Sequence, residues 1–238
     1  MRILVFNRSK ILKGVLLVFL LSLFVSILTS QNKVIPTLNK YFTIYQGQEE
    51  KKAISLAINV DWGEEYIPGL IDVLKKENVR ATFFVTGRWA KLFPDKVRAL
   101  AQAGNEIGNH GYYHKYHTSL SFEDSLKEIK ETEIVIYEIS KKRTRIFAPP
   151  YGEKEEAVIK AAYAAGYRTA YWTIDTIDWK KPSPEYIIGR VKDAGLKNGS
   201  IILMHPTAST VQALSEIVKF AKEGGYKILP VSEIAGGY

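Results

Sequence analysis

The stretch AISLAINV, from Ala53 to Val60, is an almost uninterrupted apolar run, which predicts a buried strand. A segment with helical periodicity, IPGLIDVLKKEN at 67–78, follows it, and a second apolar run, VRATFFVT, occupies 79–86. Two buried strands joined by one helix are typical of parallel pairing with a right-handed crossover. The stretch therefore predicts an α/β fold.

The same alternation continues along the rest of the chain. Further apolar runs predict strands within 144–148, 167–174, 199–204 and 226–231. Segments with helical periodicity predict helices within 90–104, 121–142, 155–166, 183–195 and 209–225. This order fits either an open doubly wound sheet or a distorted (β/α) barrel of parallel strands. We expect the barrel, because chemically suggestive residues follow several strands, as they do at a barrel rim: Asp61, His110, Pro149, Asp175 and His205.

The N-terminal region predicts a membrane segment ahead of this domain. Four basic residues lie within 1–13, and the uncharged apolar run of 17 residues from Gly14 to Ser30 approaches the length needed to cross a bilayer. The positive-inside rule predicts a single-pass protein of the cell membrane with its domain outside the cytoplasm. The run is either a retained anchor, which we favour, or a cleaved signal that would release a secreted protein. We expect a linker over 31–50 and the catalytic domain over 51–238.

Charge and cysteine content narrow the function classes. The net charge is +8, but outside the N-terminal flank 29 basic residues stand against 25 acidic ones, a net charge of +4. No basic stripe interleaved with aromatic residues is present, so nucleic acid is not an expected partner. Cysteine is absent, which excludes thiolate metal ligands and cysteine nucleophiles.

Histidines carry the first indication of chemistry. In NHGYYH, His110 and His114 are four residues apart, and on one helical turn they would face the same way and could share a metal ion. Asp61, after the first strand, could supply a third ligand at the same rim. His205 follows an apolar strand and would need a partner, which an acidic residue could provide. We expect His117 to be a solvated loop residue rather than a fourth ligand.

Four short motifs in this order resemble those of the polysaccharide deacetylases, carbohydrate esterase family 4, with the nodulation-type chitooligosaccharide deacetylase homology domain. NHGYYH resembles the family's His-Ser/Thr-x-x-His metal motif, with Gly111 where Ser or Thr is usual. FAPPYG at 147–152, DTIDW at 175–179 and LMH at 203–205 are similar to Arg-Pro-Pro-Tyr-Gly, Asp-x-x-Asp-Trp and Leu-x-His. The resemblance covers roughly 53–231.

The resemblance implies a metal-dependent hydrolase of acetamide groups on cell-wall polysaccharide, either peptidoglycan or chitooligosaccharide. It implies a divalent metal, usually zinc, bound by His110 and His114. His205 would protonate the leaving amine and Asp178 would hold its imidazolium. The main-chain N–H of Tyr151 would stabilise the oxyanion. The resemblance also implies that Trp179 and Leu203 form the walls of the acetyl pocket.

The family's first motif, Thr-Phe-Asp-Asp-Gly, is altered in this chain. Alignment by the strand puts Asn59 at the catalytic base and Val60 at the metal ligand. Alignment by the glycine puts Asp61 at the base and Trp62 at the ligand. Neither alignment restores both carboxylates. The Trp-Gly-Glu-Glu run that follows resembles the sporulation-associated subgroup of the family.

Asp61 is the candidate that can replace the missing base. An amide cannot accept a proton from water, which excludes Asn59. Residues two apart on an extended strand face the same side, so Asp61 could reach the place of residue 59. Glu64 or Glu65 is a weaker candidate. Ala148 stands where the family has the arginine that pairs with its base.

Three functions therefore stay open. The first is a membrane-anchored, metal-dependent N-deacetylase of peptidoglycan or chitooligosaccharides. The second is a catalytically impaired carbohydrate-binding relic of the same fold, and the third is a metal-binding structural protein of the spore or envelope. We favour the enzyme, because a binding protein has no evident need of a proton donor such as His205 with Asp178.

Overall fold

The central strand of the computed structural model is β2, Ala53–Val60, and every one of its residues is buried. It pairs in parallel with β3, Thr82–Val85, on one side and with β8, Ile201–Met204, on the other. Side chains alternate across β2: Ile54, Leu56, Ile58 and Val60 belong to the apolar cluster shared with the helices, whereas Ala53 and Ala57 belong to a separate inner cluster. The small residues on the inner side suit the narrow interior of a barrel.

All of the strand pairings in the described residues are parallel, in the order β1-β6-β5-β4-β3-β2-β8-β7, and β9 pairs with β2. The remaining strands are β1 (Thr43–Ile44), β4 (Glu106–Asn109), β5 (Ile146–Phe147), β6 (Arg168–Ala170), β7 (Ile174–Asp175) and β9 (Lys227–Ile228). Only residues 171–173 separate β6 from β7, although these strands lie near opposite ends of the order. The chain therefore passes directly from one end of the strand order to the other through residues 171–173. The predicted distorted α/β barrel is confirmed.

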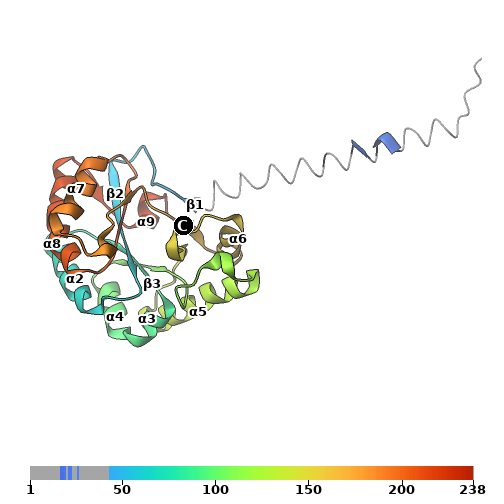
Figure 1. The fold of residues 1–238 in the computed structure, drawn as a ribbon, viewed down its shortest axis with the longest axis horizontal. Helices are drawn as coiled ribbons and strands as arrows, with labels where there is room; N and C mark the ends of the chain where they lie inside the picture. Colours follow the sequence, from blue (N-terminus) through green and yellow to red (C-terminus); the bar gives the residue numbers. More distant parts are fainter. Residues whose placement is uncertain (1–16, 20, 23–25, 27–42, 238) are drawn as a thin grey trace, which may run out of the picture. The chain divides into compact units, whose positions relative to one another are not determined.

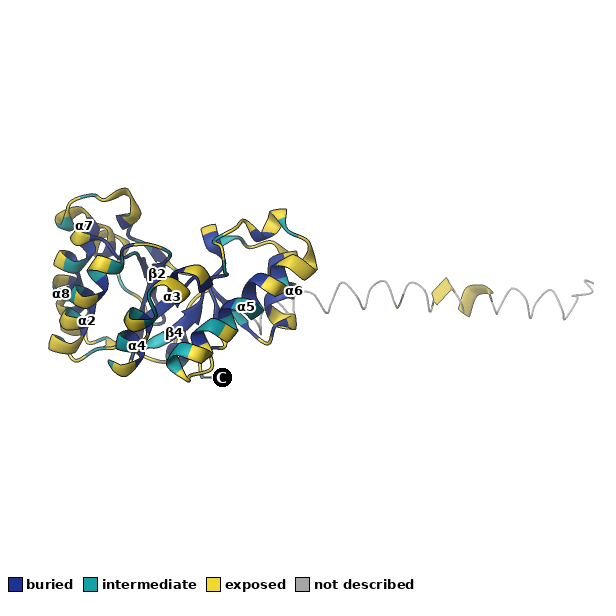
Figure 2. Ribbon diagram, turned by 90° about the horizontal axis from the view of Figure 1, so that it is seen from below, coloured by how far each residue is buried: buried dark blue, intermediate teal, exposed yellow. Residues whose placement is uncertain are grey.

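Helices surround the strands, as Figure 1 shows, and Figure 2 shows the buried strands within this exposed outer layer. The helices are α2 (Ile67–Lys76), α3 (Gly87–Leu92), α4 (Pro94–Gln102), α5 (Phe122–Ser140), α6 (Glu156–Ala164), α7 (Pro184–Ala194), α8 (Ala208–Glu223) and α9 (Val231–Ile234). Single-turn helices are η1 (Glu64–Tyr66), η2 (His117–Ser119), η3 (Pro150–Gly152) and η4 (Asp178–Lys180). Thr86, directly after β3, and Thr207, three residues after the end of β8, cap the helices that follow them through their side-chain oxygens. These caps fix the strand-to-helix turns at the rim.

Several predicted boundaries differ from the structure. The expected helix over 90–104 is two helices, because the chain breaks at Phe93 and restarts with Pro94 at the first position of α4. One strand is expected over 167–174, and the structure has β6 and β7 instead. β1 lies inside the segment 31–50 that the sequence predicts as linker, and it pairs with β6.

The structure describes residues 17–19, 21–22, 26 and 43–237. Two units separate along the chain, 1–41 and 42–238. Most of the predicted membrane segment at 14–30 and of the linker at 31–50 lies outside the described residues. Within the described ranges, no helix combines the length and the hydrophobicity that a membrane crossing requires.

Candidate active site

A cavity of about 400 Å³ opens at the carboxyl ends of the strands. Its walls come from the ends of β2, β7 and β8 and from the segments that follow β2, β4, β5, β6, β7 and β8. The lining residues are Asn59, Asp61, Trp62, His110, His114, Tyr151, Trp172, Asp175, Trp179, Leu203 and His205. Seven of the eight predicted site residues are in this group, and the eighth, Asp178, contacts His205 from behind. The rim of a parallel barrel therefore gathers the predicted residues in one place.

His205 and Asp178 form a tight pair at the end of β8. The His205 Nδ1 atom lies 2.8 Å from Asp178 Oδ1, and the His205 main-chain N–H donates to Asp178 Oδ2 at 2.6 Å. Thr210 Oγ1 donates to the same Oδ2 atom at 2.7 Å, so the fully buried carboxylate has three hydrogen bonds. With Nδ1 engaged, the Nε2 atom of His205 is the ring nitrogen left for a ligand.

His110 and His114 meet in a loop, and the prediction that they share a helical turn is wrong. β4 ends at Asn109, and the segment after it is irregular, with φ of 74° at Gly111 and 55° at His114. The two imidazole centroids are nevertheless 4.9 Å apart. Gly111 and His114 both have left-handed backbone conformations, so an irregular loop rather than a helical turn brings the two rings together.

The imidazoles of His110 and His114 are in the protonation state that metal binding requires. Burial lowers the pKa of His110 to about 3, and burial also lowers the pKa of His114, although Asp61 opposes the shift there. Both rings are therefore neutral near pH 7, the form in which histidine binds metals. The His110 Nδ1 atom lies 2.7 Å from the carbonyl oxygen of Ala148, which fixes the ring and leaves Nε2 as the free nitrogen.

The third predicted ligand, Asp61, is already engaged. Its Oδ1 atom accepts hydrogen bonds from Thr86 Oγ1 and Arg88 Nε, both at 2.8 Å, and Oδ2 accepts a short one from Arg88 Nη2. Burial opposes ionisation of Asp61, but the hydrogen bonds from Arg88 and Thr86 outweigh it and lower its pKa. A carboxylate has about four acceptor sites, so one site on Oδ2 is left.

These residues fit a divalent metal only in part. Among the described residues, no three His, Cys, Asp or Glu side chains are placed together to hold a metal ion. His110 and His114 supply two oriented nitrogen donors, and the carboxylate that should complete the set is held by Arg88. The metal site therefore stays a prediction, with His110 and His114 as its best supported ligands.

The structure shows which residues of the altered first motif reach the cavity. Asn59 lines the cavity, whereas Val60 is buried in the apolar cluster next to the helices. Asp61, two residues beyond Asn59, lines the cavity again, as the alternation of a strand predicts. Asn59 Oδ1 is buried and has no hydrogen-bond partner among the described residues, so the cavity wall contains an acceptor that is not engaged by them.

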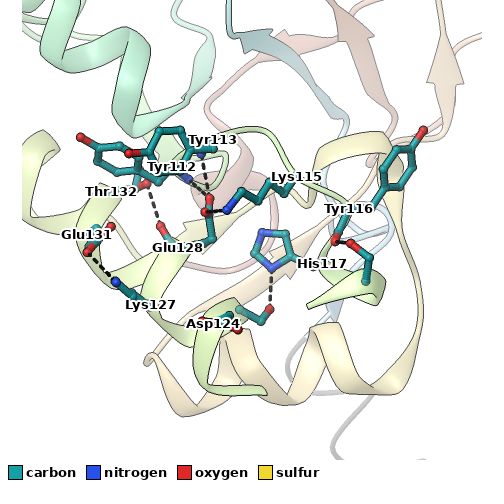
Figure 3. A network of polar contacts seen from close by, with 12 residues as sticks. Tyr112, Tyr113, Lys115, Tyr116, His117, Asp124, Lys127, Glu128, Glu131 and Thr132 are labelled. Carbon is teal, nitrogen blue, oxygen red and sulfur yellow. Dashed lines mark hydrogen bonds and ion pairs between the residues drawn. The ribbon is translucent and has the colours of Figure 1, made fainter. Parts of the chain in front are cut away.

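A buried carboxylate on α5 holds the loop that carries the histidines (Figure 3). Glu128 Oε2 accepts hydrogen bonds from the main-chain N–H groups of Tyr112 and Tyr113 at 2.8 and 2.7 Å. Lys115 Nζ lies 3.4 Å from Oε1 of the same side chain. These contacts fix the backbone between His110 and His114 through an element that is distant in sequence.

His117 is buried, and the prediction of a solvated loop residue is wrong. Its Nδ1 atom lies 2.5 Å from Ser125 Oγ on α5, and Figure 3 shows the ring turned toward that helix. A Cβ atom at Gly111 would lie 3.1 Å from His117 Nε2. His117 thus lies beside the space that a Ser or Thr side chain at position 111 would enter, and this chain has Gly111 there.

The other predicted residues lie at the cavity in different ways. Leu203 is buried in its wall, whereas Trp179 and Tyr151 are exposed at its mouth. Tyr151 has a φ of 60° and stacks on Tyr116 with a centroid separation of 3.7 Å. Asp175 Oδ1 accepts a hydrogen bond from the N–H of Ile177 at 2.8 Å, so its carboxylate starts a turn rather than orienting His205.

Sequence reasoning missed two residues that matter at this site. Arg88 was not among the candidates, although it follows an expected strand and the strand-end rule would have drawn attention to it. Trp62 was considered only as an alignment partner, but its ring lies parallel to that of His205, with an interplanar angle of 4° and centroids 6.1 Å apart. Neither contact leaves a periodic signal in the sequence.

Comparison with known proteins agrees with this geometry. A family model described as polysaccharide deacetylase matches residues 46–170. The chain is 36% identical over 191 residues to the uncharacterized protein YlxY of Bacillus subtilis, covering 80% of this chain and 60% of that protein. It is 31% identical over 195 residues to a peptidoglycan-N-acetylglucosamine deacetylase of Bacillus cereus, covering 80% of this chain and 70% of that protein. The chain thus spans well under two thirds of the length of YlxY.

Two solved structures are similar to this chain. BA3943 of Bacillus anthracis, described as a pseudoenzyme of carbohydrate esterase family 4, is 39% identical with a TM-score of 0.78, and the match covers 80% of this chain and 68% of that one. A mutant of BA3943, described as having restored enzymatic activity, is 38% identical with the same TM-score of 0.78, over 80% of this chain and 70% of that one.

The resemblance predicted from the motifs is therefore confirmed at the level of the family and of its reaction class. Enzymes of this class hydrolyse the amide bonds of N-acetylated polysaccharides and in general depend on a metal ion. The family match over 46–170, together with relatives such as the deacetylase of Bacillus cereus, shows that this chain belongs to the polysaccharide deacetylase family.

Proposed function

We propose that this chain removes acetyl groups from the N-acetylated glycan of the bacterial cell wall. One observation carries the proposal: a single cavity brings together an arginine-paired carboxylate, Asp61, two neutral imidazoles and a carboxylate-held imidazole, His205. Such a set contains a candidate proton acceptor and a candidate proton donor for hydrolysis of an acetamide. The deacetylases among its relatives support peptidoglycan as the substrate class.

His205 would act as the proton donor. Its Nδ1 atom is engaged by Asp178, so Nε2 is the atom that would pass a proton to the leaving amine. Asp178 is buried and accepts hydrogen bonds from the His205 main chain and from Thr210, so its carboxylate is fixed and holds the ring in one orientation. Leu203 and Trp179 would enclose the acetyl methyl group, and the Tyr151 N–H would donate to the oxyanion.

Asp61 would act as the proton acceptor, with Arg88 in place of the missing arginine. The family's arginine position is occupied by the buried Ala148, but Arg88 reaches Asp61 from the first turn of α3. The acceptor site left on Asp61 Oδ2 would take the proton of the attacking water. A carboxylate with a low pKa is a weak base, so this arrangement predicts slow turnover.

His110 and His114 would hold a divalent ion, and we propose zinc because it accepts two nitrogen donors together with oxygen ligands. When bound, such an ion polarises the acetamide carbonyl and acidifies water. Glu128 would keep the two rings in place through the backbone between them.

We also propose that the enzyme acts outside the cytoplasmic membrane and stays attached to it. The basic flank ahead of the apolar run at 14–30 supports this orientation. The likeness of the Trp-Gly-Glu-Glu run to the sporulation-associated subgroup supports a role in cell-wall remodelling during sporulation.

Acetate release tests the main proposal. Full-length protein with added zinc should release acetate from peptidoglycan or N-acetylglucosamine oligomers, and Asp61→Asn should abolish the release by removing the proton acceptor. Asp72→Asn, an exposed change on α2, serves as the matched control. Equal release by the wild type and Asp61→Asn would show that Asp61 is not the base.

A second function is favoured by a specific observation: the chain binds an N-acetylated glycan without hydrolysing it. In the alignment by the strand, Asn59 occupies the place of the family's base, and its free Oδ1 acceptor could bind an acetamide N–H. The pseudoenzyme BA3943, 39% identical, supports this reading. Glycan binding without acetate release under all metal conditions would establish it.

A further inference from the structure

The amino ends of the strands lie at the end of the barrel opposite the catalytic cavity, and α9 closes this end. Val231 and Ile234 of α9 belong to the inner apolar cluster, together with Ala53 at the start of β2. The main-chain N–H of Val231 donates to Thr82 Oγ1 at 2.8 Å, at the start of β3. We call this end of the barrel, made of α9 and the segments that lead into the strands, the amino face.

Basic residues collect at the amino face. The segments that lead into β2, β3, β4, β5, β6, β8 and β9 are 47–52, 77–81, 103–105, 141–145, 165–167, 195–200 and 224–226. They contain eight basic residues and three acidic ones, a net charge of +5. The basic residues, all exposed, are Lys51, Lys52, Arg80, Lys141, Lys142, Arg143, Arg145 and Lys197. The segments between each strand and the α-helix that follows it contain four basic residues and six acidic ones, a net charge of −2.

Most cations of the amino face have no carboxylate partner. Among the described residues, Arg80 is the one member of the eight that forms an ion pair, with Glu233 of α9 at 2.8 Å. Glu77, an acidic residue of the same segments, is engaged by Ser215 Oγ at 2.7 Å and by Lys222 of α8. The excess positive charge of this face is therefore not neutralised within the described part of the chain.

Helix dipoles account for some of these cations but not for all. Lys142 serves a helix end, because its Nζ atom donates to the carbonyl oxygen of Ala101 near the end of α4. Lys51 and Lys52 instead follow a strand, and with Lys227 they line a cavity of about 740 Å³ on the amino face. The carboxylate in that lining belongs to Glu233, which Arg80 already neutralises. Such a hollow favours an anionic group.

The chain enters the domain at the same face. The Gly47 N–H donates to the carbonyl oxygen of Gly199, just before β8, and the Gln48 N–H donates to that of Ile234 in α9, both at 2.8 Å. Twelve residues, 31–42, separate the predicted membrane segment from β1. Fully extended, they reach about 40 Å, roughly the diameter of a domain of this size, so the amino face cannot lie far from the bilayer.

We infer that the amino face lies against the anionic surface of the membrane that holds the apolar segment, with lipid phosphates beside Lys51, Lys52 and Lys227. Basic side chains close to an anionic bilayer each add to the attraction, and the short tether gives the face a high effective concentration there. An anionic polymer of the wall would not explain why the basic face is also the face at which the tether enters. The inference rests on the proposed retention of 14–30 in the membrane. The catalytic cavity then opens away from the bilayer, toward the wall.

Fluorescence quenching of the full-length protein in lipid nanodiscs tests this orientation. The chain has no cysteine, so Ala194→Cys and Glu185→Cys place a single label at either end of α7, at exposed positions. The quencher is attached to lipid headgroups. In discs that contain phosphatidylglycerol, the label at 194, on the side of the amino face, should be quenched more than the label at 185. The difference should shrink in phosphatidylcholine discs and at high salt.

Charge removal identifies the residues responsible. A triple variant that replaces the lysines of the amino-face cavity should lose the quenching difference: Lys51→Gln, Lys52→Gln and Lys227→Gln. A matched triple variant removes the same charge from exposed positions on α3, α5 and α6 and should keep the difference: Lys91→Gln, Lys127→Gln and Lys160→Gln.

Two results overturn the orientation. One is equal quenching at both ends of α7 in anionic discs, and the other is the same loss in both triple variants. Binding of isolated polyglycerol phosphate that disappears in the first triple variant, without any quenching difference in the discs, would assign the face to a wall polymer and also overturn the membrane contact.

Sedimentation with vesicles reports the anchor separately. Wild-type protein that does not sediment with phosphatidylcholine vesicles would refute the anchor. Salt-sensitive sedimentation with phosphatidylglycerol vesicles, lost in the first triple variant alone, would still support the basic face as a membrane contact. A protein that sediments with neither kind of vesicle overturns both. Acetate release is not part of either measurement, so a failed deacetylase leaves the result intact.

Discussion

The guanidinium of Arg88 donates to both carboxylate oxygens of Asp61, through Nε to Oδ1 at 2.8 Å and through Nη2 to Oδ2. The pair joins the first turn of α3 to the residue that follows β2, and Asp61 lines the same cavity as His110 and His114. Arg88 therefore controls how much of the carboxylate is left for a metal or for a proton.

The first prediction follows from this pair. Arg88→Gln should raise the affinity for zinc, on the order of tenfold, because it removes a positive charge near the ion and frees acceptor sites on Asp61. Zinc titration of the metal-free protein measures the change. Arg98→Gln is the matched control, since Arg98 is as exposed as Arg88 and pairs with Asp95 on the outside of α4. Equal affinities in the two variants would contradict the prediction.

The second prediction concerns the proton donor. His205→Ala should lower the acetate release rate by about a hundredfold, the usual contribution of general acid catalysis. Asp178→Asn should cause a large part of the same loss, since it removes the acceptor that holds the ring. The double variant should be little worse than His205→Ala, because both changes disrupt one unit. Additive losses in steady-state kinetics would mean that the two residues act separately.

Asn59→Asp provides the third prediction and separates the two proposed functions. The new carboxylate should not increase acetate release, because Asp61 lies two residues away and Ala148 offers it no cation. It should also lower the free energy of unfolding by about 1–3 kcal/mol, because a charged carboxylate without a partner costs more to bury than the neutral amide it replaces. Urea unfolding and acetate assays measure the two effects. If the wild type is inert and Asn59→Asp with Ala148→Arg creates activity, the binding function is correct and Asp61 is not the base.

The fourth prediction is a pH dependence of stability. Burial lowers the pKa of His117, with Glu128 and Glu153 opposing the shift, so its folded-state pKa lies below its unfolded value. Above about pH 6.5 both states are neutral, and as the pH falls below that value the unfolded state takes up the proton first. Stability should therefore decrease from about pH 6.5 downward until the folded-state pKa is passed.

His117→Gln should make this decrease shallower. His110 and His114 are unchanged in the variant, so their contribution cancels in the comparison. Urea unfolding midpoints between pH 7.5 and pH 5 measure the slopes. Identical slopes in the variant and the wild type would show that His117 does not contribute.

The fifth prediction is topological. If the apolar run from Gly14 to Ser30 is a retained anchor, protease added to intact spheroplasts should digest the domain. After cell fractionation, the undigested protein should remain with the membranes. A protected domain would reverse the orientation, and a soluble form beginning near Gln31 would identify the run as a cleaved signal.

The sequence by itself determined the parts of this protein that depend on local pattern. Apolar runs such as Ala53–Val60 predict β2 and β8 because a buried parallel strand needs apolar side chains on both faces. The repeated order of strand and helix then predicts the barrel, and the barrel predicts that strand-end residues meet. For this reason the motifs around His110, Asp178 and His205 sufficed to identify the family and to place its residues at one cavity.

Only the tertiary structure decided what those residues touch. The Asp61–Arg88 pair and the parallel rings of Trp62 and His205 join segments that follow different strands, and the Glu128 contacts join the histidine loop to the helix after it. Short strands such as β1 and β4 depend on their neighbours in the sheet and have little pattern of their own. Turns have no period, so side-chain directions at the rim depend on individual φ angles and on the order of the strands. That is why a chain with a recognisable family can leave its catalytic base to be located by the fold.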